Sequence, residues 1–167
     1  PPTVPFVSDY HDHPAYLRAL TEHVRASWAG HGRPDHTVLS FHGIPQSYAD
    51  NGDAELDGPQ DTATLLADAL DLGEEWTLSF QSRFGPAQWL PPYTVDVLAD
   101  LASRDLGRVD VVCPGFAVDC LETVDEIGRE AARHYHEHGG GDFRYVPALN
   151  ASPAHGLALA EVLRPYL

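Results

Sequence analysis

Two short stretches of this sequence carry side chains whose types and spacing could do chemistry. One is a histidine, His42, which follows an apolar run and precedes Gly43. The other is a series of carboxylates, Glu122, Glu126 and Glu130, spaced four residues apart. A neutral imidazole can bind a metal ion or accept a proton near neutral pH, and carboxylate oxygens bind divalent cations. The combination predicts metal handling rather than phosphate binding.

Each of these features also has a structural interpretation. A histidine in this position can simply close a strand end, and position alone favours that interpretation of His42. Carboxylates spaced by four stack on one helix face, where they repel one another, and a solvated acidic face is the alternative to a metal path. Other histidines lie near the N-terminus or in the last turns of the same predicted helix, where positive charge suits the helix dipole. We interpret these as structural: His11, His13, His134, His136 and His138.

Composition excludes several classes of protein. The 167 residues suit one domain, and a net charge of -15 argues against binding of a nucleic-acid backbone. Two cysteines make neither a disulfide framework nor a four-thiolate metal site, which predicts a reducing, cytoplasmic location. No apolar run has the length of a transmembrane helix. The chain has no methionine and begins at Pro1, so we expect that it could be a fragment.

Predicted strands and helices alternate along the chain and must position the candidate residues. Strands are predicted over 36–41, 76–80, 109–113 and 143–149, and helices over 14–28, 61–72, 93–106, 121–138 and 153–166, with a polar loop over 46–58. This alternation predicts a single α/β domain over residues 1–167, with a four-stranded parallel sheet in three layers and flavodoxin-like strand order. His42 and Glu122 then lie beyond the carboxyl ends of strands, where such sheets bind ligands.

Several ordered segments resemble the C-terminal half of ferrochelatase, the lyase that inserts ferrous iron into a porphyrin in haem synthesis. The resemblance runs from about Tyr10 to Leu167. It rests on the segments Ser40–Pro45, Ser79–Gly85, Trp89–Thr94, Cys113–Thr123 and Pro147–Asn150. A chelatase-like half-domain is therefore the fold that the resemblance implies.

The resemblance also implies a role for each candidate residue. His42 would accept a pyrrole proton or bind the incoming iron, and Glu122 would take a proton or pass the metal. Glu126 and Glu130 would extend a metal path, and we expect a helix irregularity near Glu122, as functional helices often have. The residues implied as walls of the porphyrin site are Ser82, Arg83, Gly85, Pro86 and Trp89.

The implied partners follow from the shortness of the chain. Full-length ferrochelatases hold the porphyrin between two similar domains, so either the N-terminal half or a homodimer mate is expected to complete the site. Porphyrin, with protoporphyrin IX favoured, and ferrous iron are the expected substrates. No tightly bound cofactor is expected, and the cysteines that bind an iron-sulfur cluster in some members have no counterpart here. The alternatives are a small homodimeric chelatase and a non-catalytic haem- or metal-binding module.

Overall fold

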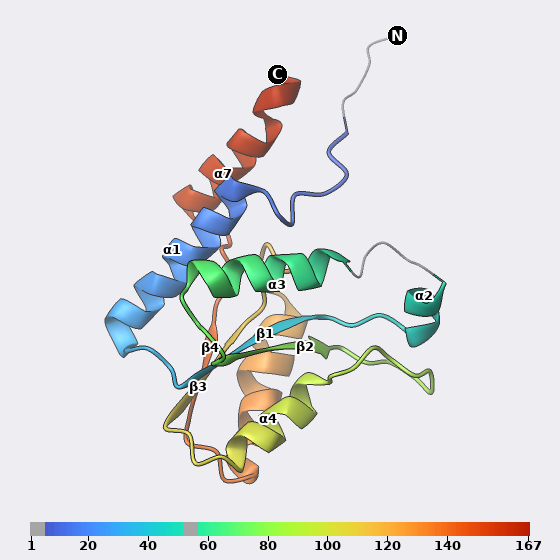
Figure 1. The fold of residues 1–167 in the computed structure, drawn as a ribbon, viewed down its shortest axis with the longest axis vertical. Coiled ribbons are helices and arrows are strands. Elements are labelled where there is room, and N and C mark those ends of the chain that lie inside the picture. The colour runs from blue at the N-terminus through green and yellow to red at the C-terminus, as the bar shows by residue number, and fades with distance from the viewer. Residues whose placement is uncertain (1–5, 52–56) are drawn as a thin grey trace.

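Within residues 6–51 and 57–167, which the computed structural model describes, the centre is a four-stranded parallel sheet (Figure 1). Its strands are β1 (His36–His42), β2 (Trp76–Gln81), β3 (Arg108–Val112) and β4 (Asp142–Val146). They lie in the order β2-β1-β3-β4, and all three neighbouring pairs are parallel. The predicted α/β class and flavodoxin-like order are confirmed.

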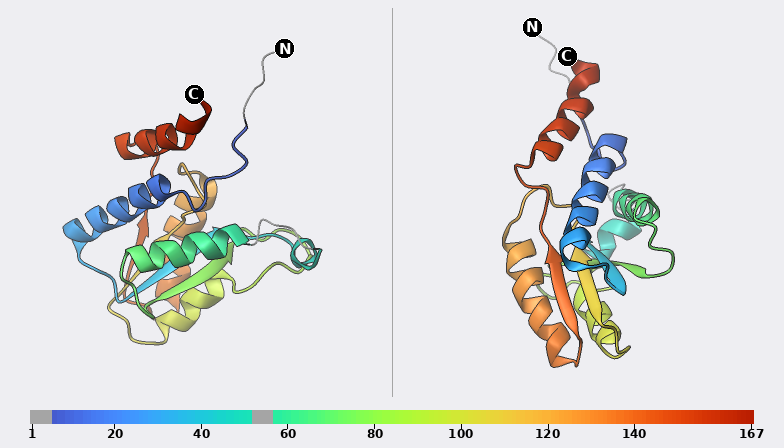
Figure 2. Two further views of the ribbon diagram at one scale, coloured as in Figure 1. Left: turned by 45° about the horizontal axis from the view of Figure 1, so that its top comes forward. Right: turned by 90° about the vertical axis from the view of Figure 1, so that its left-hand side faces the viewer.

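Helices cover both faces of the sheet and complete the predicted three layers (Figure 2). Three helices share a core with one face: α1 (Pro14–His31), α3 (Asp57–Ala69) and α7 (Pro153–Leu163). The other face packs against α4 (Thr94–Ala102) and the helical run that begins at Leu121. Because side chains alternate along a strand, the adjacent residues Val38 and Leu39 are both fully buried, each in a different core.

The helical run after Leu121 is not one regular helix. It consists of α5 (Leu121–Val124), a π-helical turn η2 (Glu126–Ala131) and α6 (Ala132–Glu137). The wider turn is visible in its backbone bonding, because the amide of Glu130 donates to the carbonyl of Asp125 at 2.9 Å, five residues back. The single helix predicted over 121–138 is therefore interrupted, with the irregularity close to Glu122.

Some element ends differ from the sequence prediction for local reasons. The strand predicted to reach residue 149 stops at Val146, because Pro147 has no amide hydrogen for the ladder. The helix predicted over 93–106 ends at Ala102, before a turn in which Asp105 adopts a φ of 53°. A 3-10 turn, η3 (Arg164–Tyr166), follows α7.

The polar loop predicted over 46–58 contains a short helix, α2 (Gln46–Asp50). Residues 52–56 of that loop lie outside the described part of the chain. Among the helices that the structure describes, none is both long and apolar enough to cross a bilayer.

One ion pair is buried inside the sheet. Asp110 on β3 is fully buried and lies opposite Arg144 on β4, whose guanidinium donates to both of its carboxylate oxygens. The indole N–H of Trp28 donates to the same carboxylate at 3.0 Å. Removing one partner of the ion pair would leave a buried charge uncompensated. The indole contact from Trp28 connects α1 to this pair and so to the sheet.

Candidate functional site

His42 lies at the carboxyl end of β1 with its side chain exposed. Its Nδ1 is 2.7 Å from the backbone oxygen of Gly43. Because a carbonyl oxygen only accepts, Nδ1 must carry the hydrogen of the neutral ring, which leaves the lone pair on Nε2. The ring of Trp89 lies beside it, with the two centroids 6.3 Å apart. The imidazole is thus held in the tautomer that can accept a proton or bind a metal.

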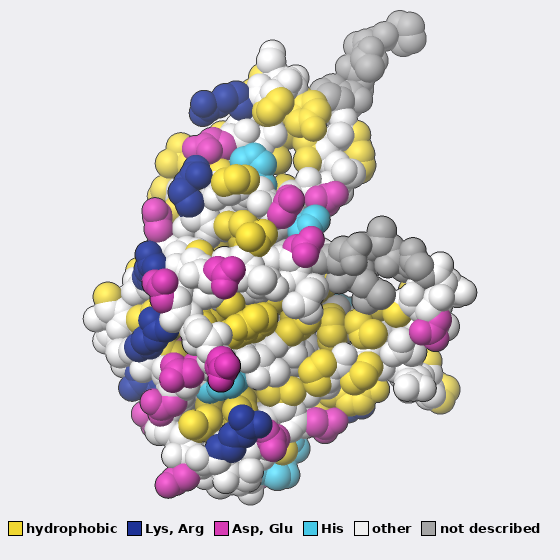
Figure 3. Space-filling view, viewed as in Figure 1, with side chains coloured by type: hydrophobic (Ala, Val, Ile, Leu, Met, Phe, Trp, Pro, Cys, Tyr) yellow, Lys and Arg dark blue, Asp and Glu magenta, His cyan; other side chains and the backbone are white. Residues whose placement is uncertain are grey.

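His42 forms part of the wall of the larger of two cavities at this edge of the sheet, which we call the large cavity. Its volume is about 840 Å³, and its apolar wall includes Phe41, Phe80, Tyr16 and Pro114. Figure 3 shows the molecule hollowed between the end that holds α1 and α7 and the arm that carries α2. A space of this size and polarity suits a flat organic ligand.

Glu122 lies in the first turn of α5, close to His42. A hydrogen bond from the Cys120 thiol lowers the pKa of Glu122, its own backbone amide adds to this, and the charge of His42 lowers the pKa further. The glutamate is therefore ionised at neutral pH. The structure brings these two predicted residues, far apart in sequence, to the same end of the sheet.

Gln81, which the sequence reasoning missed, connects the strands to Glu122. It pairs with His42 in the β1–β2 register and is 3% exposed. Its amide nitrogen donates to the backbone oxygen of Glu122 at 2.6 Å, and its amide oxygen accepts from Ser40 Oγ at 2.7 Å and Cys113 Sγ at 3.4 Å. The signal available in the sequence was a polar amide at the end of a buried strand.

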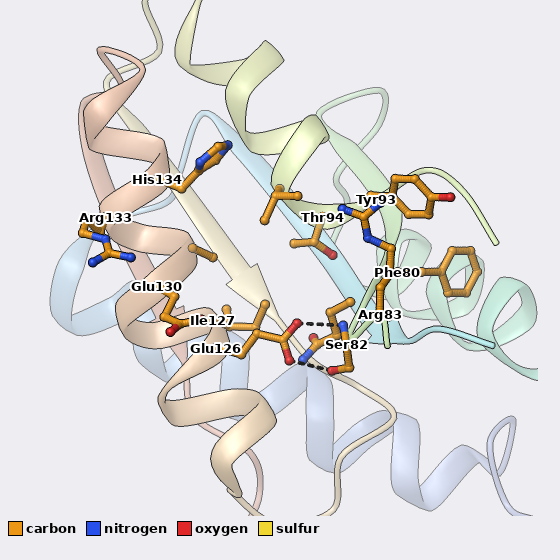
Figure 4. A pocket seen from close by; sticks show the side chains of 13 residues that line it. Phe80, Ser82, Arg83, Tyr93, Thr94, Glu126, Ile127, Glu130, Arg133 and His134 are labelled. Carbon is orange, nitrogen blue, oxygen red and sulfur yellow. Dashed lines mark hydrogen bonds between the residues drawn. The ribbon is translucent and has the colours of Figure 1, made fainter. Parts of the chain in front are cut away.

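Glu126 and Glu130 face a second, small cavity of about 330 Å³ (Figure 4). The carboxylate of Glu126 accepts from the amide of Ser82 at 2.7 Å and from its hydroxyl at 2.6 Å. Ser82 can present both donors because its backbone is left-handed, with φ 63°. His134 lines the same cavity. Carboxylates and imidazole around a narrow space form a donor set for a divalent cation.

The five residues predicted to wall the porphyrin are divided by the structure. Ser82 and Arg83 line the small cavity, where the guanidinium of Arg83 lies 3.8 Å from the centre of the Tyr93 ring. Gly85 and Pro86 are exposed on the loop after β2. The remaining residue, Trp89, is 9% exposed, and its indole N–H donates to the Phe84 carbonyl at 2.9 Å. Of the predicted site residues, His42 alone is among those that line the large cavity.

Asp119, which the sequence places just before the acidic helix, does not join the carboxylate series. Burial alone would raise its pKa, but hydrogen bonds from Asn150, Tyr145, the amide of Ala148 and Thr123 together lower the pKa. The Tyr145 hydroxyl is 2.7 Å away and the Asn150 amide 2.8 Å. Asp119 therefore fixes the loop from which α5 starts.

A separate group of possible metal ligands lies at the edge of the large cavity. Asp9, His11 and Asp12 offer ligand atoms within 4.8 Å of one another, and all three line that cavity. His11 Nδ1 is 2.9 Å from an Asp9 oxygen, and its Nε2 is 4.0 Å from Asp61. Asp9 and Asp12 are both exposed to solvent.

Comparison with known proteins gives a consistent result. The sequence profile of the Ferrochelatase family matches residues 1–167. The ferrochelatase of Methylococcus capsulatus is 49% identical over 167 residues, which cover 99% of this chain and 51% of the relative. The ferrochelatase of Nitrosomonas europaea is 46% identical over 167 residues, covering 99% and 46%. That of Thioalkalivibrio sulfidiphilus is 49% identical over 163 residues, covering 97% and 44%.

The chain thus spans about half the length of the curated relatives that it matches. The similarity nevertheless extends over almost all of its own residues, including both candidate cavities. This chain belongs to the ferrochelatase family.

Proposed function

We propose that this chain is the metal-handling half of a ferrochelatase, acting in the insertion of ferrous iron into a porphyrin, with protoporphyrin IX the favoured ring. The observation that carries the proposal is the placement of His42, with its free Nε2, and ionised Glu122 at the same end of the sheet, a place that we call the junction. The names of the relatives support the reaction class. The rest of a full-length chain, corresponding to an N-terminal half, completes the porphyrin site.

Proton balance assigns the roles of the two residues at the junction. Iron insertion breaks two pyrrole N–H bonds and forms bonds from iron to the ring nitrogens, so Fe²⁺ replaces two protons. His42 Nε2 accepts one of these protons as a general base. Glu122 receives the arriving ion through its carboxylate and takes up the second proton as the ion leaves it.

The metal arrives through the small cavity. Carboxylate oxygens exchange readily on divalent ions, so Glu126 and Glu130 can pass an ion along without trapping it. The arginines of this helix are engaged by its own acidic residues. Arg129 is 2.7 Å from Asp125, and Arg133 is 3.9 Å from Glu137, which reduces their repulsion of a cation.

The porphyrin occupies the large cavity, with its apolar ring against Phe41, Phe80 and Pro114. Three exposed apolar side chains outside the cavity wall, Val118, Leu121 and Phe84, offer further surface to a ring or to the other half. Distorting a macrocycle toward the metal-accepting geometry draws on contacts over its whole area. Half of the cleft therefore supports binding, and both halves are needed for turnover.

A reconstitution experiment tests the proposal. The chain is mixed with the N-terminal half of the Methylococcus capsulatus relative, and zinc insertion into protoporphyrin is followed by fluorescence. We expect activity from the mixture and little from either half. His42→Ala should lower the activity of the mixture by about 10²–10⁴-fold, the range for loss of a general base. Because His42 is exposed, its removal should leave the unfolding transition unchanged.

Other results would support the alternatives. Porphyrin binding without insertion, under conditions where the full-length relative is active, would favour a non-catalytic binding module. Insertion by the chain alone, running as a dimer in gel filtration, would favour a homodimeric chelatase. Full activity in the His42→Ala mixture would remove this histidine from the mechanism.

A further inference from the structure

A pair of histidines extends the carboxylate series beyond Glu130. His134 lines the small cavity together with Glu126 and Glu130 (Figure 4). His138 follows one helical turn later, and the centroids of the two imidazole rings are 4.2 Å apart. Histidines spaced by four residues share one face of a helix, the arrangement that holds zinc in helical metal sites.

The hydrogen bonding of His138 favours metal binding. Its Nδ1 is 2.8 Å from the backbone oxygen of His134, so Nδ1 must be the donor. The neutral ring then presents the Nε2 lone pair, with its second nitrogen fixed by a carbonyl, as metal-binding histidines usually have it. A role confined to the helix dipole, which the sequence alone favoured, requires neither the place of His134 in the cavity wall nor its ring contact with His138.

The neighbouring His136 provides a contrast within the same turn. Its ring packs near Tyr135 and Phe143, with centroid distances of 5.8 and 6.5 Å, whereas the ring of His138 packs against that of His134, which lines the small cavity. The Nδ1 of His136 lies 3.4 Å from the Gly140 carbonyl. His136 is therefore a histidine near the same helix end as His134 and His138, but its ring packs against different residues.

We propose that His134 and His138 form a two-imidazole loading site for first-row transition ions at the outer end of the small cavity. The site takes up the ion before it passes to Glu130 and then to Glu126, and in this respect the inference rests on the proposed function. Four residues of regular α-helix rise roughly 6 Å at about 1.5 Å per residue, and the π-helical turn over Glu126–Ala131 departs from this spacing. Steps of this length let an ion exchange one set of ligands for the next.

The order of ligand types gives the loading site a purpose. Carboxylates alone accept Mg²⁺ and Ca²⁺ as well as Fe²⁺, whereas imidazole favours transition ions over these hard cations. Histidines ahead of the carboxylates would therefore select the ion before it reaches the junction with the porphyrin. The substrate class of this site is a divalent transition ion, with Zn²⁺ and Co²⁺ as stand-ins for oxygen-sensitive Fe²⁺.

Calorimetric titration of the chain with Zn²⁺ tests the proposal. We expect His134→Ala and His138→Ala each to weaken zinc binding by about ten-fold or more. Each variant keeps only one of the two imidazole ligands, so the gain in affinity from linking them is lost. Millimolar Mg²⁺ should not displace the zinc. His136→Ala is the matched control and should bind as the parent does. His11→Ala controls for binding at the exposed Asp9, His11 and Asp12 group.

Unchanged zinc affinity in both His134→Ala and His138→Ala would overturn the loading site, as would an equal loss in His136→Ala. A loss seen only in His11→Ala would move the zinc to the edge of the large cavity and equally overturn it. Glu122→Gln separates this inference from the proposed function. That variant should lose porphyrin metallation in the reconstituted mixture and keep full zinc affinity at the histidine pair.

Discussion

The large and small cavities differ in size, polarity and neighbours, although both lie at one edge of the same sheet. The large cavity is about 840 Å³ with aromatic and proline side chains in its wall. The small cavity is about 330 Å³, and its wall combines carboxylate, guanidinium and imidazole groups with apolar side chains such as Phe80, Tyr93 and Ile127. The difference fits the proposed function, in which the large cavity takes a flat ring and the small cavity takes a metal ion. His42 lines the large cavity, and Glu122 lies close to His42 at the same end of the sheet.

The connection between the cavities is a buried polar cluster. Gln81 joins β1, β2 and the end of β3 to the first turn of α5. Thr94 Oγ1 lies within 2.9 Å of the hydroxyl groups of Ser40 and Ser79 below it. Fully satisfied polar clusters of this kind are rigid, so His42 and Glu122 are held at a fixed separation.

The largest effect is expected at the junction itself. Glu122→Gln removes the charge that receives the metal in the proposed function, so metallation by the reconstituted halves should fall by about 10²–10⁴-fold. Porphyrin binding should be retained, because Glu122 is not among the residues that line the large cavity. Absorbance titration with porphyrin and the insertion assay measure the two properties separately. Loss of both porphyrin binding and metal insertion in Glu122→Gln would contradict the separate roles of the two cavities.

The next largest effect is expected from the connection. Gln81→Leu leaves the Ser40 hydroxyl and the Glu122 carbonyl without their buried partner. We expect the free energy of unfolding to fall by about 2 kcal/mol, a factor of roughly 30 in the folding equilibrium constant. Urea unfolding checks this value. Gln88→Leu, at an exposed glutamine in the following loop, is the matched control and should be close to neutral. A Gln81→Leu variant as stable as the control would contradict the account of the cluster.

A matched pair of variants sharpens the comparison. Glu130→Gln, in the small cavity, should raise the KM for zinc by about ten-fold without changing the KM for porphyrin, because one carboxylate ligand of the path is lost. Ile44→Ser, in the wall of the large cavity, should raise the KM for porphyrin and leave that for zinc unchanged. Steady-state kinetics of the reconstituted halves gives both constants. Crossed effects would show that the two substrates share one space.

The smallest effect concerns the loop that starts α5. The pKa of Asp119 is lower in the folded chain than its ordinary value, so its contribution to stability is complete above about pH 4 and is lost as pH falls through the folded pKa. Asp119→Asn should cost about 1 kcal/mol at pH 7, after allowance for partial exposure. The difference from the parent should shrink in urea unfolding at pH 3. A constant difference between the two pH values would exclude this linkage.

The sequence predicts the sheet because apolar runs mark every strand and helices separate them. The irregularity of the acidic helix was also expected, although the residue at which the wide turn begins depends on packing. Gln81 could not be assigned, since its role arises from the register of β1 against β2. Nor could the contact of Glu126 with Ser82, which requires a left-handed backbone at a serine rather than a glycine. The roles of the individual site residues stay predictions.

A crystal structure of the reconstituted halves with metal-free porphyrin and Co²⁺ tests the central claim most directly. The account predicts a ring in the large cavity with its pyrrole nitrogens toward His42 Nε2, and cobalt density beside Glu126 and Glu130. Porphyrin seated against Ser82 and Arg83 in the small cavity would contradict it. Cobalt bound solely at Asp9, His11 and Asp12, on the porphyrin side, would contradict it as well.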